Sequence, residues 1–273
     1  MRNYKKLVIY SLLILVALVS VGPFLWLLST ALKGPGDNLF VFPPQVIPRD
    51  FTLANFVRVF EQVPFMRFFT NSVIVTAAAV TTNIVFALLA AFPLARMRFA
   101  GKRLILIGIL GTIMIPFQIS MIPLFVLAME LGLRNTYIGI IIPNIVTPFG
   151  IFLLRQALTG IPKSLEESAH MDGAKSYHVL FRVLMPLVKP SIAALAIFAF
   201  MMTWDDFLWP LLIIEDQSMF TLPLGVQRLQ GTFTNNWRLI AAGSIMALAP
   251  VLVFFSVAQR WFIEGALAGA VKG

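Results

Sequence analysis

Six long runs of apolar residues constrain what this chain can fold into. Each run approaches the roughly 20 helical residues that cross a hydrocarbon core. They lie near residues 7–32, 71–95, 104–129, 137–154, 190–214 and 240–262. Because lipid cannot satisfy backbone polar groups, an apolar run that is long enough to cross is expected to be helical. The sequence therefore predicts an all-α integral membrane bundle of six transmembrane helices, in one domain over residues 1–273.

Composition supports this class of protein. Hydrophobic residues make up 59% of the chain and charged residues only 12%, whereas soluble domains have roughly 25% charged residues. The first run follows Arg2, Lys5 and Lys6, as a signal peptide would. Its apolar stretch is about twice the usual length of a signal sequence, so we expect an uncleaved first span.

The distribution of positive charge predicts the orientation. With six spans both termini lie on one side, and that side holds fourteen of the 21 Lys and Arg residues. The short link 96–103 alone carries four of them. Cytoplasmic loops are enriched in Lys and Arg, so both termini are expected on the cytoplasmic side of the membrane. The same asymmetry explains the net charge of +9 without a nucleic-acid partner.

Several function classes lack their sequence signals. The chain has no cysteine, and His170 and His178 stand eight residues apart without a third ligand nearby, so no metal site is predicted. Neither G-x-S-x-G nor H-E-x-x-H occurs, which argues against an enzyme. The phosphate-binding pattern G-x-x-x-x-G-K-[ST] is also missing, so this chain is not expected to bind nucleotide.

The segment 155–189, between the fourth and fifth spans, is polar and predicted to be cytoplasmic. Ser164 and Glu167 fit a capping box, in which Ser164 would accept from the Glu167 backbone N–H. Glu166 and Glu167 also suit the positive end of a helix dipole. We expect a short helix from Leu165 to Asp172 that stops at Gly173, where a left-handed residue costs least.

A second amphipathic helix is expected after that turn. Tyr177, Leu180, Phe181 and Leu184 fall on one face, and Pro186 is expected to end the helix. The segment is thus predicted to be a helix-turn-helix. A solvated helix of about eight residues is marginal by itself, so we expect a partner to dock on it, although a loop that merely covers its own bundle is the alternative.

The same residues resemble a known signature. Glu167, Ser168, Ala169 and Gly173, followed by Val183–Pro186, are similar to E-A-A-x3-G-x9-I-x-L-P of the membrane subunits of bacterial ATP-binding-cassette importers. Ser168 replaces an Ala, and Val183 and Met185 replace Ile and Leu. Other segments resemble the smaller, six-span subunit of maltose-type carbohydrate importers: 51–60, 90–103, 131–143, 204–213, 221–231 and 262–273.

This resemblance implies a permease subunit of the bacterial inner membrane that moves a sugar or sugar-like solute by alternating access. The short helix would be the coupling helix of a separate ATPase dimer, which binds ATP and Mg. The residues expected to serve that coupling are Ser164, Glu166, Glu167, Ser168, Ala169, Asp172, Gly173 and Pro186. A second permease subunit and an extracytoplasmic solute-binding protein are the other implied partners.

The C-terminal tail, residues 263–273, is rich in small residues and is predicted to be flexible. By resemblance it inserts between the ATPase subunits, with contacts from Glu264, Gly265 and Gly269.

Asp205 and Asp206 are the only acidic residues placed within a predicted span, in its outer half. Charges at that depth usually face an aqueous cavity or a partner. With Trp204 and Trp209 beside them, they are candidates for the solute pathway, because sugar sites combine carboxylates with aromatic faces. The alternative is that one Asp caps a kink or pairs across a subunit interface, and that Trp209 is an interfacial anchor.

The remaining polar residues in the runs, Asn83, Gln118 and Asn144, are expected to form interhelical hydrogen bonds. An ion-coupled secondary transporter that needs no ATPase is the alternative function, but it should show inverted repeats and several intramembrane ionisable groups. The sequence leaves open the solute, whether this chain or its partner contacts it, and whether the permease pair is a homodimer or a heterodimer.

Overall fold

A computed structural model describes residues 2–230 and 236–270 of the chain. Within these ranges the chain is helical apart from loops, and an isolated bridge between Lys33 and Phe51 is the one β-type pairing. The chain divides into two compact units. The first holds the residues up to Met66 together with Leu224–Pro250, and the second holds Arg67–Pro223 together with the chain from Val251 onward.

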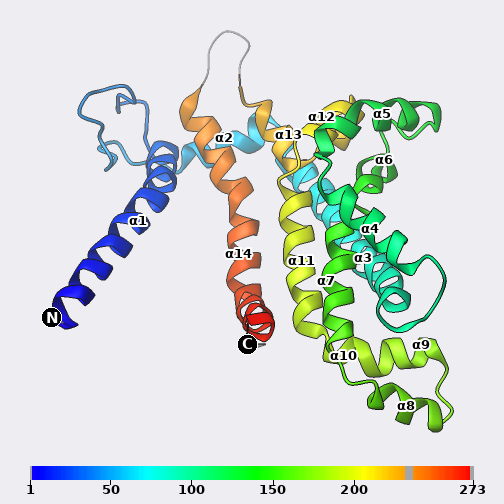
Figure 1. Ribbon diagram of the computed structural model, residues 1–273. Helices are drawn as coiled ribbons and strands as arrows, with labels where there is room; N and C mark the ends of the chain where they lie inside the picture. Colours follow the sequence, from blue (N-terminus) through cyan, green and yellow to red (C-terminus); the bar gives the residue numbers. More distant parts are fainter. Residues whose placement is uncertain (1, 231–235, 271–273) are drawn as a thin grey trace. The chain divides into compact units, whose positions relative to one another are not determined.

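The helical elements follow one another along the chain, with a long loop between the first two (Figure 1). They are α1 Arg2–Ala31, α2 Ala54–Gln62, α3 Phe65–Arg96, α4 Lys102–Ile113, α5 Phe117–Glu130, α6 Tyr137–Ile141, the 3-10 turn η1 Ile142–Asn144, α7 Pro148–Thr159, α8 Ser164–Met171, α9 Ser176–His178, the π-helical segment η2 Val179–Leu184, α10 Met185–Leu187, α11 Lys189–Trp204, α12 Leu208–Ile213, the 3-10 turn η3 Gln217–Met219, α13 Leu222–Gln227 and α14 Trp237–Ala270.

Three helical stretches are long and apolar enough to cross a membrane by themselves: Lys6–Ala31, Phe65–Arg96 and Trp237–Gln259. Three bent pairs of helices bring the number to six if each pair is counted as one span. The bends are 100° between α4 and α5, 48° between the α6–η1 segment and α7, and 82° between the segment Ser176–Leu187 and α11.

The breaks fall inside or beside the apolar runs, and prolines account for several of them. Pro116 follows the end of α4 and Pro148 begins α7. Proline has no N–H to donate and disfavours the helical conformation of the residue before it. The predicted run 190–214 is also interrupted, because α11 ends at Trp204 and α12 begins at Leu208.

In the first unit, polar side chains organise the loop that follows α1. The Asn55 amide donates to the carbonyl oxygens of Ala31 and Lys33 at 2.8 and 2.9 Å, which satisfies carbonyls at the end of α1. The Asp37 carboxylate accepts from the backbone N–H groups of Arg49 and Asp50. Lys33 is buried, with its ammonium 4.6 Å from the centre of the Trp26 ring. A satisfied set of polar groups therefore holds this loop.

In the second unit, the core joins the ends of α3, α7 and α11 to the segment around η2. Its buried members include Leu88, Leu154, Leu158, Leu184 and Leu195. Figure 1 shows α8, α9 and α10 as a group at the ends of α7 and α11, and α5 and α12 at the opposite ends. The polar segment 155–189 is thus seated on the bundle by its own apolar side chains.

At the opposite end of this unit, buried hydrogen bonds connect α3, α6 and the chain around α12. The Asn71 amide donates to the carbonyl oxygens of Ser218 and Phe220 at 2.8 and 2.9 Å. Trp209, whose side chain is fully buried, donates its indole N–H to the Gly139 carbonyl at 2.9 Å. This end is therefore fixed by specific polar contacts as well as by apolar packing.

Gly139 tests the close packing at this end. A Cβ at Gly139 would collide with the carbonyl oxygen of Leu133, whereas a Cβ at Gly108 in α4 would meet nothing within 4 Å. We expect Gly139→Ala to destabilise the protein by about 1–3 kcal/mol, the usual cost of overpacking. Gly108→Ala should be neutral or slightly stabilising, because Ala is the better helix former. Thermal unfolding of both variants in detergent measures the difference, and equal midpoints would contradict the packing described.

Candidate functional site

The short helix α8 begins differently from the capping-box prediction. Its N-cap is Lys163, whose carbonyl accepts from the N–H groups of Glu166 and Glu167 at 2.9 and 3.1 Å. Lys163 itself has a helical backbone, with φ −66° and ψ −27°, and no side chain caps the helix. Ser164 is therefore the first helical residue rather than the cap. The predicted capping box is wrong, because its Ser must keep an extended backbone outside the helix.

The end of α8 agrees with the prediction. Gly173 has φ +80°, in the left-handed region. Its N–H donates to the His170 carbonyl at 3.0 Å, and the next N–H, from Ala174, donates to the Ala169 carbonyl at 2.9 Å. These two bonds form a Schellman motif, which closes the helix and turns the chain back.

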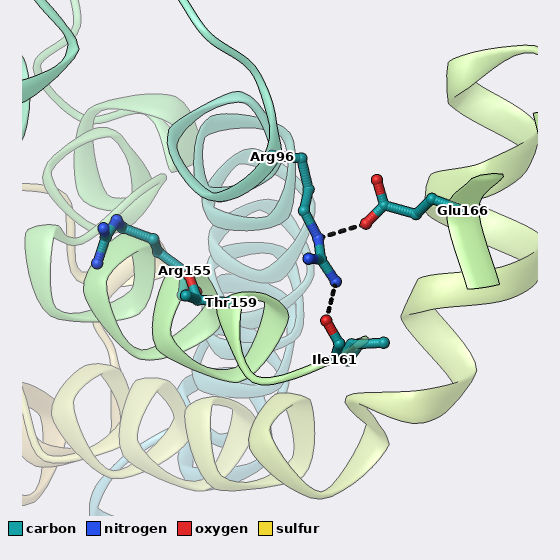
Figure 2. A network of polar contacts seen from close by, with 5 residues as sticks. All are labelled: Arg96, Arg155, Thr159, Ile161 and Glu166. Atoms are coloured by element: carbon teal, nitrogen blue, oxygen red, sulfur yellow. Dashed lines mark hydrogen bonds and ion pairs between the residues drawn. The ribbon is translucent and has the colours of Figure 1, made fainter. Parts of the chain in front are cut away.

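An arginine from α3 holds α8 against the bundle (Figure 2). Arg96, the last residue of α3, forms an ion pair with Glu166 and donates to the Ile161 carbonyl at 2.9 Å. The side chains of Arg96 and Glu166 are only 5% and 15% exposed. A pair with so little access to water is disrupted at high cost when one partner is removed. One guanidinium thus connects the end of α3 both to α8 and to the turn that precedes it.

A second arginine joins α7 to α3. Arg155 donates from Nε to the Leu94 carbonyl at 3.2 Å, and Thr159, one turn later, donates its hydroxyl to the Arg155 carbonyl at 2.8 Å. Sequence reasoning counted Arg96 and Arg155 only as charges that set the orientation. Neither lies at a helical spacing from its partner, so no local pattern could have identified these contacts.

No residue of the described part of the chain covers the face of α8 that points away from the bundle. Ala169 packs on the core, while Leu165 is 44% exposed and Met171 is 89% exposed. Glu167, Ser168 and Asp172 are exposed as well. The helix therefore presents apolar and acidic side chains outward from a base that is fixed by Arg96.

The predicted face of the second helix is partly wrong. Leu180 and Leu184 are buried as expected, but Val179 replaces Tyr177 and Phe181, which are both exposed. The reason is the π-helical form of Val179–Leu184, whose wider turn changes which residues share a face. Helical structure also continues past Pro186 to Leu187, so that proline does not end the helix.

A hollow of about 580 Å³ lies on the other side of the second unit, where α11 gives way to α12. Asp205 and Asp206 line it, together with Gln118 and Asn144. The Asp206 carboxylate also accepts from the Trp209 N–H at 3.3 Å, at the start of α12. The two carboxylates therefore occupy the break between helices, beside a cavity with further polar groups.

The structure does not place the neighbouring tryptophans in that hollow. Trp204 and Trp209 are buried, and Trp209 is fixed by its bond to Gly139. Neither presents a free aromatic face next to the carboxylates. Asn83 does form the expected interhelical contact, because its amide donates to the Asn144 carbonyl at 3.2 Å and to the Thr147 hydroxyl at 3.3 Å.

The predicted flexible tail is helical over most of its length. α14 continues to Ala270, so residues 263–270 extend the last helix. The prediction of a flexible coil, which rested on small residues such as Gly265 and Gly269, is therefore wrong for these residues. The side chains of Glu264 and of its neighbours lie outside the part that the structure describes. The contacts predicted for Glu264, Gly265 and Gly269 therefore stay predictions.

The architecture and the exposed helix are those of a membrane component of a solute importer, and comparison with known proteins identifies the family. Residues 83–265 match the family described as "Binding-protein-dependent transport system inner membrane component", and the chain belongs to it. It is thus a permease component of a binding-protein-dependent transport system in the inner membrane. The resemblance seen in the sequence is confirmed, and the ion-coupled alternative is not supported.

Individual relatives are similar over nearly the whole chain. The arabinooligosaccharides transport system permease protein AraQ of Halalkalibacterium halodurans is 37% identical, with 94% of this chain and 93% of that protein covered. The diacetylchitobiose uptake system permease protein DasC of Streptomyces coelicolor is 33% identical, with 93% and 92% covered. A chain of a bacterial transporter that imports the acidic polysaccharide alginate has the same fold, with a TM-score of 0.84, 24% identity, and 95% and 97% covered.

The Arg96–Glu166 pair predicts unequal effects at two adjacent glutamates. Glu166→Gln leaves the guanidinium without its partner, so we expect a loss of about 1–3 kcal/mol in the stability of the α8 segment. Glu167→Gln alters an exposed side chain and should have little effect. Hydrogen–deuterium exchange over 161–174 measures the local stability of each variant, and equal exchange in the two would show that the pair does not hold α8.

Proposed function

We propose that this permease moves a di- or oligosaccharide delivered by an extracytoplasmic binding protein, driven by a separate ATPase dimer that binds ATP and Mg. The proposal for the solute is supported by the names of relatives that transport arabinooligosaccharides, diacetylchitobiose and lactose. A second permease subunit would complete the pathway. The observation that carries the coupling proposal is α8, which is fixed to the bundle on one side and uncovered on the other.

In this proposal α8 is the coupling helix. The ATPase would bind the outward face formed by Leu165, Ser168 and Met171. The charges of Glu167 and Asp172 would orient the ATPase on this face. Because Arg96 binds both Glu166 and the Ile161 carbonyl, movement of α8 would be passed directly to the end of α3. The Schellman turn at Gly173 would keep the helix from moving independently of η2.

The same proposal assigns the topology. The Lys and Arg bias puts both termini, α8 and the link 96–103 in the cytoplasm. The hollow at Asp205 and Asp206 lies where α11 gives way to α12. Figure 1 shows α12 at the end of the second unit opposite to α8, so this proposal puts the hollow on the outer side. Carboxylates accept hydrogen bonds from sugar hydroxyls, so we propose that solute contacts this hollow during transfer, with Gln118 and Asn144 as further polar groups.

Met171 tests the docking face. Met171→Glu puts a charge at an 89% exposed apolar side chain, so the permease itself should keep its thermal stability. If the ATPase covers this face, burial of the new charge should reduce co-purification of the ATPase by at least tenfold, since an unpaired buried charge is costly. Met171→Leu is the matched control and should retain the subunit. Normal co-purification with Met171→Glu would rule out this docking face.

Asp205 and Asp206 test the solute pathway. We expect Asp205→Asn and Asp206→Asn to raise KM for uptake by roughly tenfold, because each hydrogen bond to a charged acceptor contributes about 1.5–3 kcal/mol. ATPase co-purification should not change. Asp216→Asn is the control, since this carboxylate caps η3 and does not line the hollow. A KM that is unaltered in all three variants would show that the partner permease supplies the contacts.

A further inference from the structure

A second hollow, of about 560 Å³, lies beside the start of α4 and is separate from the two sites described above. We call it the basic hollow. The residues that line it are Phe99, Gly101, Lys102, Arg103, Leu104, Leu106 and Arg155. Three of the seven are cations and no carboxylate is among them, so the hollow is suited to an anion.

These cations are not neutralised within the described part of the chain. The ion pairs found there join Arg96 with Glu166 and Arg134 with Glu215. Lys102 and Arg155 instead donate to backbone carbonyls, those of Met97 and Leu94. Figure 2 shows the Arg155 guanidinium directed away from the Arg96–Glu166 pair. Like charges held together in this way gain from an external anion.

Lys163, which does not line the hollow, adds a further positive charge near Lys102. Burial lowers the pKa of the Lys102 ammonium, and the nearby charges of Arg155 and Lys163 lower it further. Neutral hydrogen-bond acceptors satisfy the N–H groups but leave this mutual repulsion in place. A bound phosphate would offset it, and a guanidinium can contact phosphate oxygens through two N–H groups at once.

An apolar surface continues from the basic hollow along α4. Leu104 is 74% exposed, and Ile105 and Ile107 on the same helix are exposed as well. Phe99 and Leu106 line the hollow itself. A ligand that fits both parts has an anionic head and a hydrocarbon tail.

We propose that the basic hollow binds the phosphate headgroup of an anionic phospholipid, with an acyl chain lying along α4. The placement at the cytoplasmic leaflet rests on the topology proposed above. Basic pockets between transmembrane helices on the cytoplasmic side are a recurrent way to bind such headgroups. A free phosphate would use the cations but not the apolar side chains of α4, which favours the lipid.

The test compares two double variants of the complete transporter, purified in detergent. Lys102→Gln/Arg103→Gln removes two charges from the hollow and leaves Arg155, which has a structural bond to Leu94. Lys175→Gln/Lys189→Gln removes two exposed charges outside it. Native mass spectrometry then counts bound phosphatidylglycerol over a titration. We expect the first variant to bind one lipid at least tenfold more weakly, since each cation near a lipid surface contributes about a fivefold gain in affinity, and the second variant to match the wild type.

Phosphatidylcholine and inorganic phosphate are the other arms of the titration. Phosphatidylcholine should not occupy the site, and inorganic phosphate should not displace phosphatidylglycerol at equal concentration. Equal phosphatidylglycerol binding by both double variants would overturn the proposal. So would displacement by inorganic phosphate, which would show a free-anion site, or loss of a protein subunit from the first variant alone, which would show a subunit interface. Lipid counting needs no transport, so its outcome is independent of the sugar and coupling proposals.

Discussion

The contact between Arg96 and α8 is the interaction on which the position of this short helix depends. A helix of eight residues has little stability of its own in water, and α8 buries none of its residues completely. Besides the packing of Ala169 on the core, it is fixed by one guanidinium that pairs with a carboxylate on α8 and donates to a backbone carbonyl just before it. Because the pair has little access to water, its geometry is specific, and the outward face of α8 is held in a defined position relative to α3.

The Arg96 contact fixes a helix in place, whereas the breaks in the apolar runs release backbone groups and side chains from regular helix. Lipid-exposed backbone must stay helical, so interruptions are tolerated where protein or a water-filled cavity surrounds them. The break between α11 and α12 places Asp205 and Asp206 beside a hollow, and the bend between α4 and α5 contributes Phe117 and Gln118 to its wall. The irregular positions of the bundle thus coincide with its polar cavity.

The sequence predicted those features that follow from composition and local spacing. Apolar length predicted the helices, and Gly173 predicted the left-handed turn, which the structure confirms at φ +80°. The same local reasoning failed at Ser164, because Lys163 is the N-cap and the helix begins at Ser164, one residue before the capping box would allow. It also failed at Tyr177 and Phe181, because an α-helical period was applied to a π-helical segment.

By itself the sequence determined the class of protein and the position of the short exposed helix, since these depend on hydrophobic length and on a motif of fixed spacing. Only the tertiary structure decided what holds that helix, because Arg96 and Glu166 are 70 residues apart and no periodicity connects them. It also decided that Trp204 and Trp209 are buried beside the carboxylates rather than exposed with them. Burial and long-range pairing arise from packing between elements, and a linear pattern carries no record of that packing.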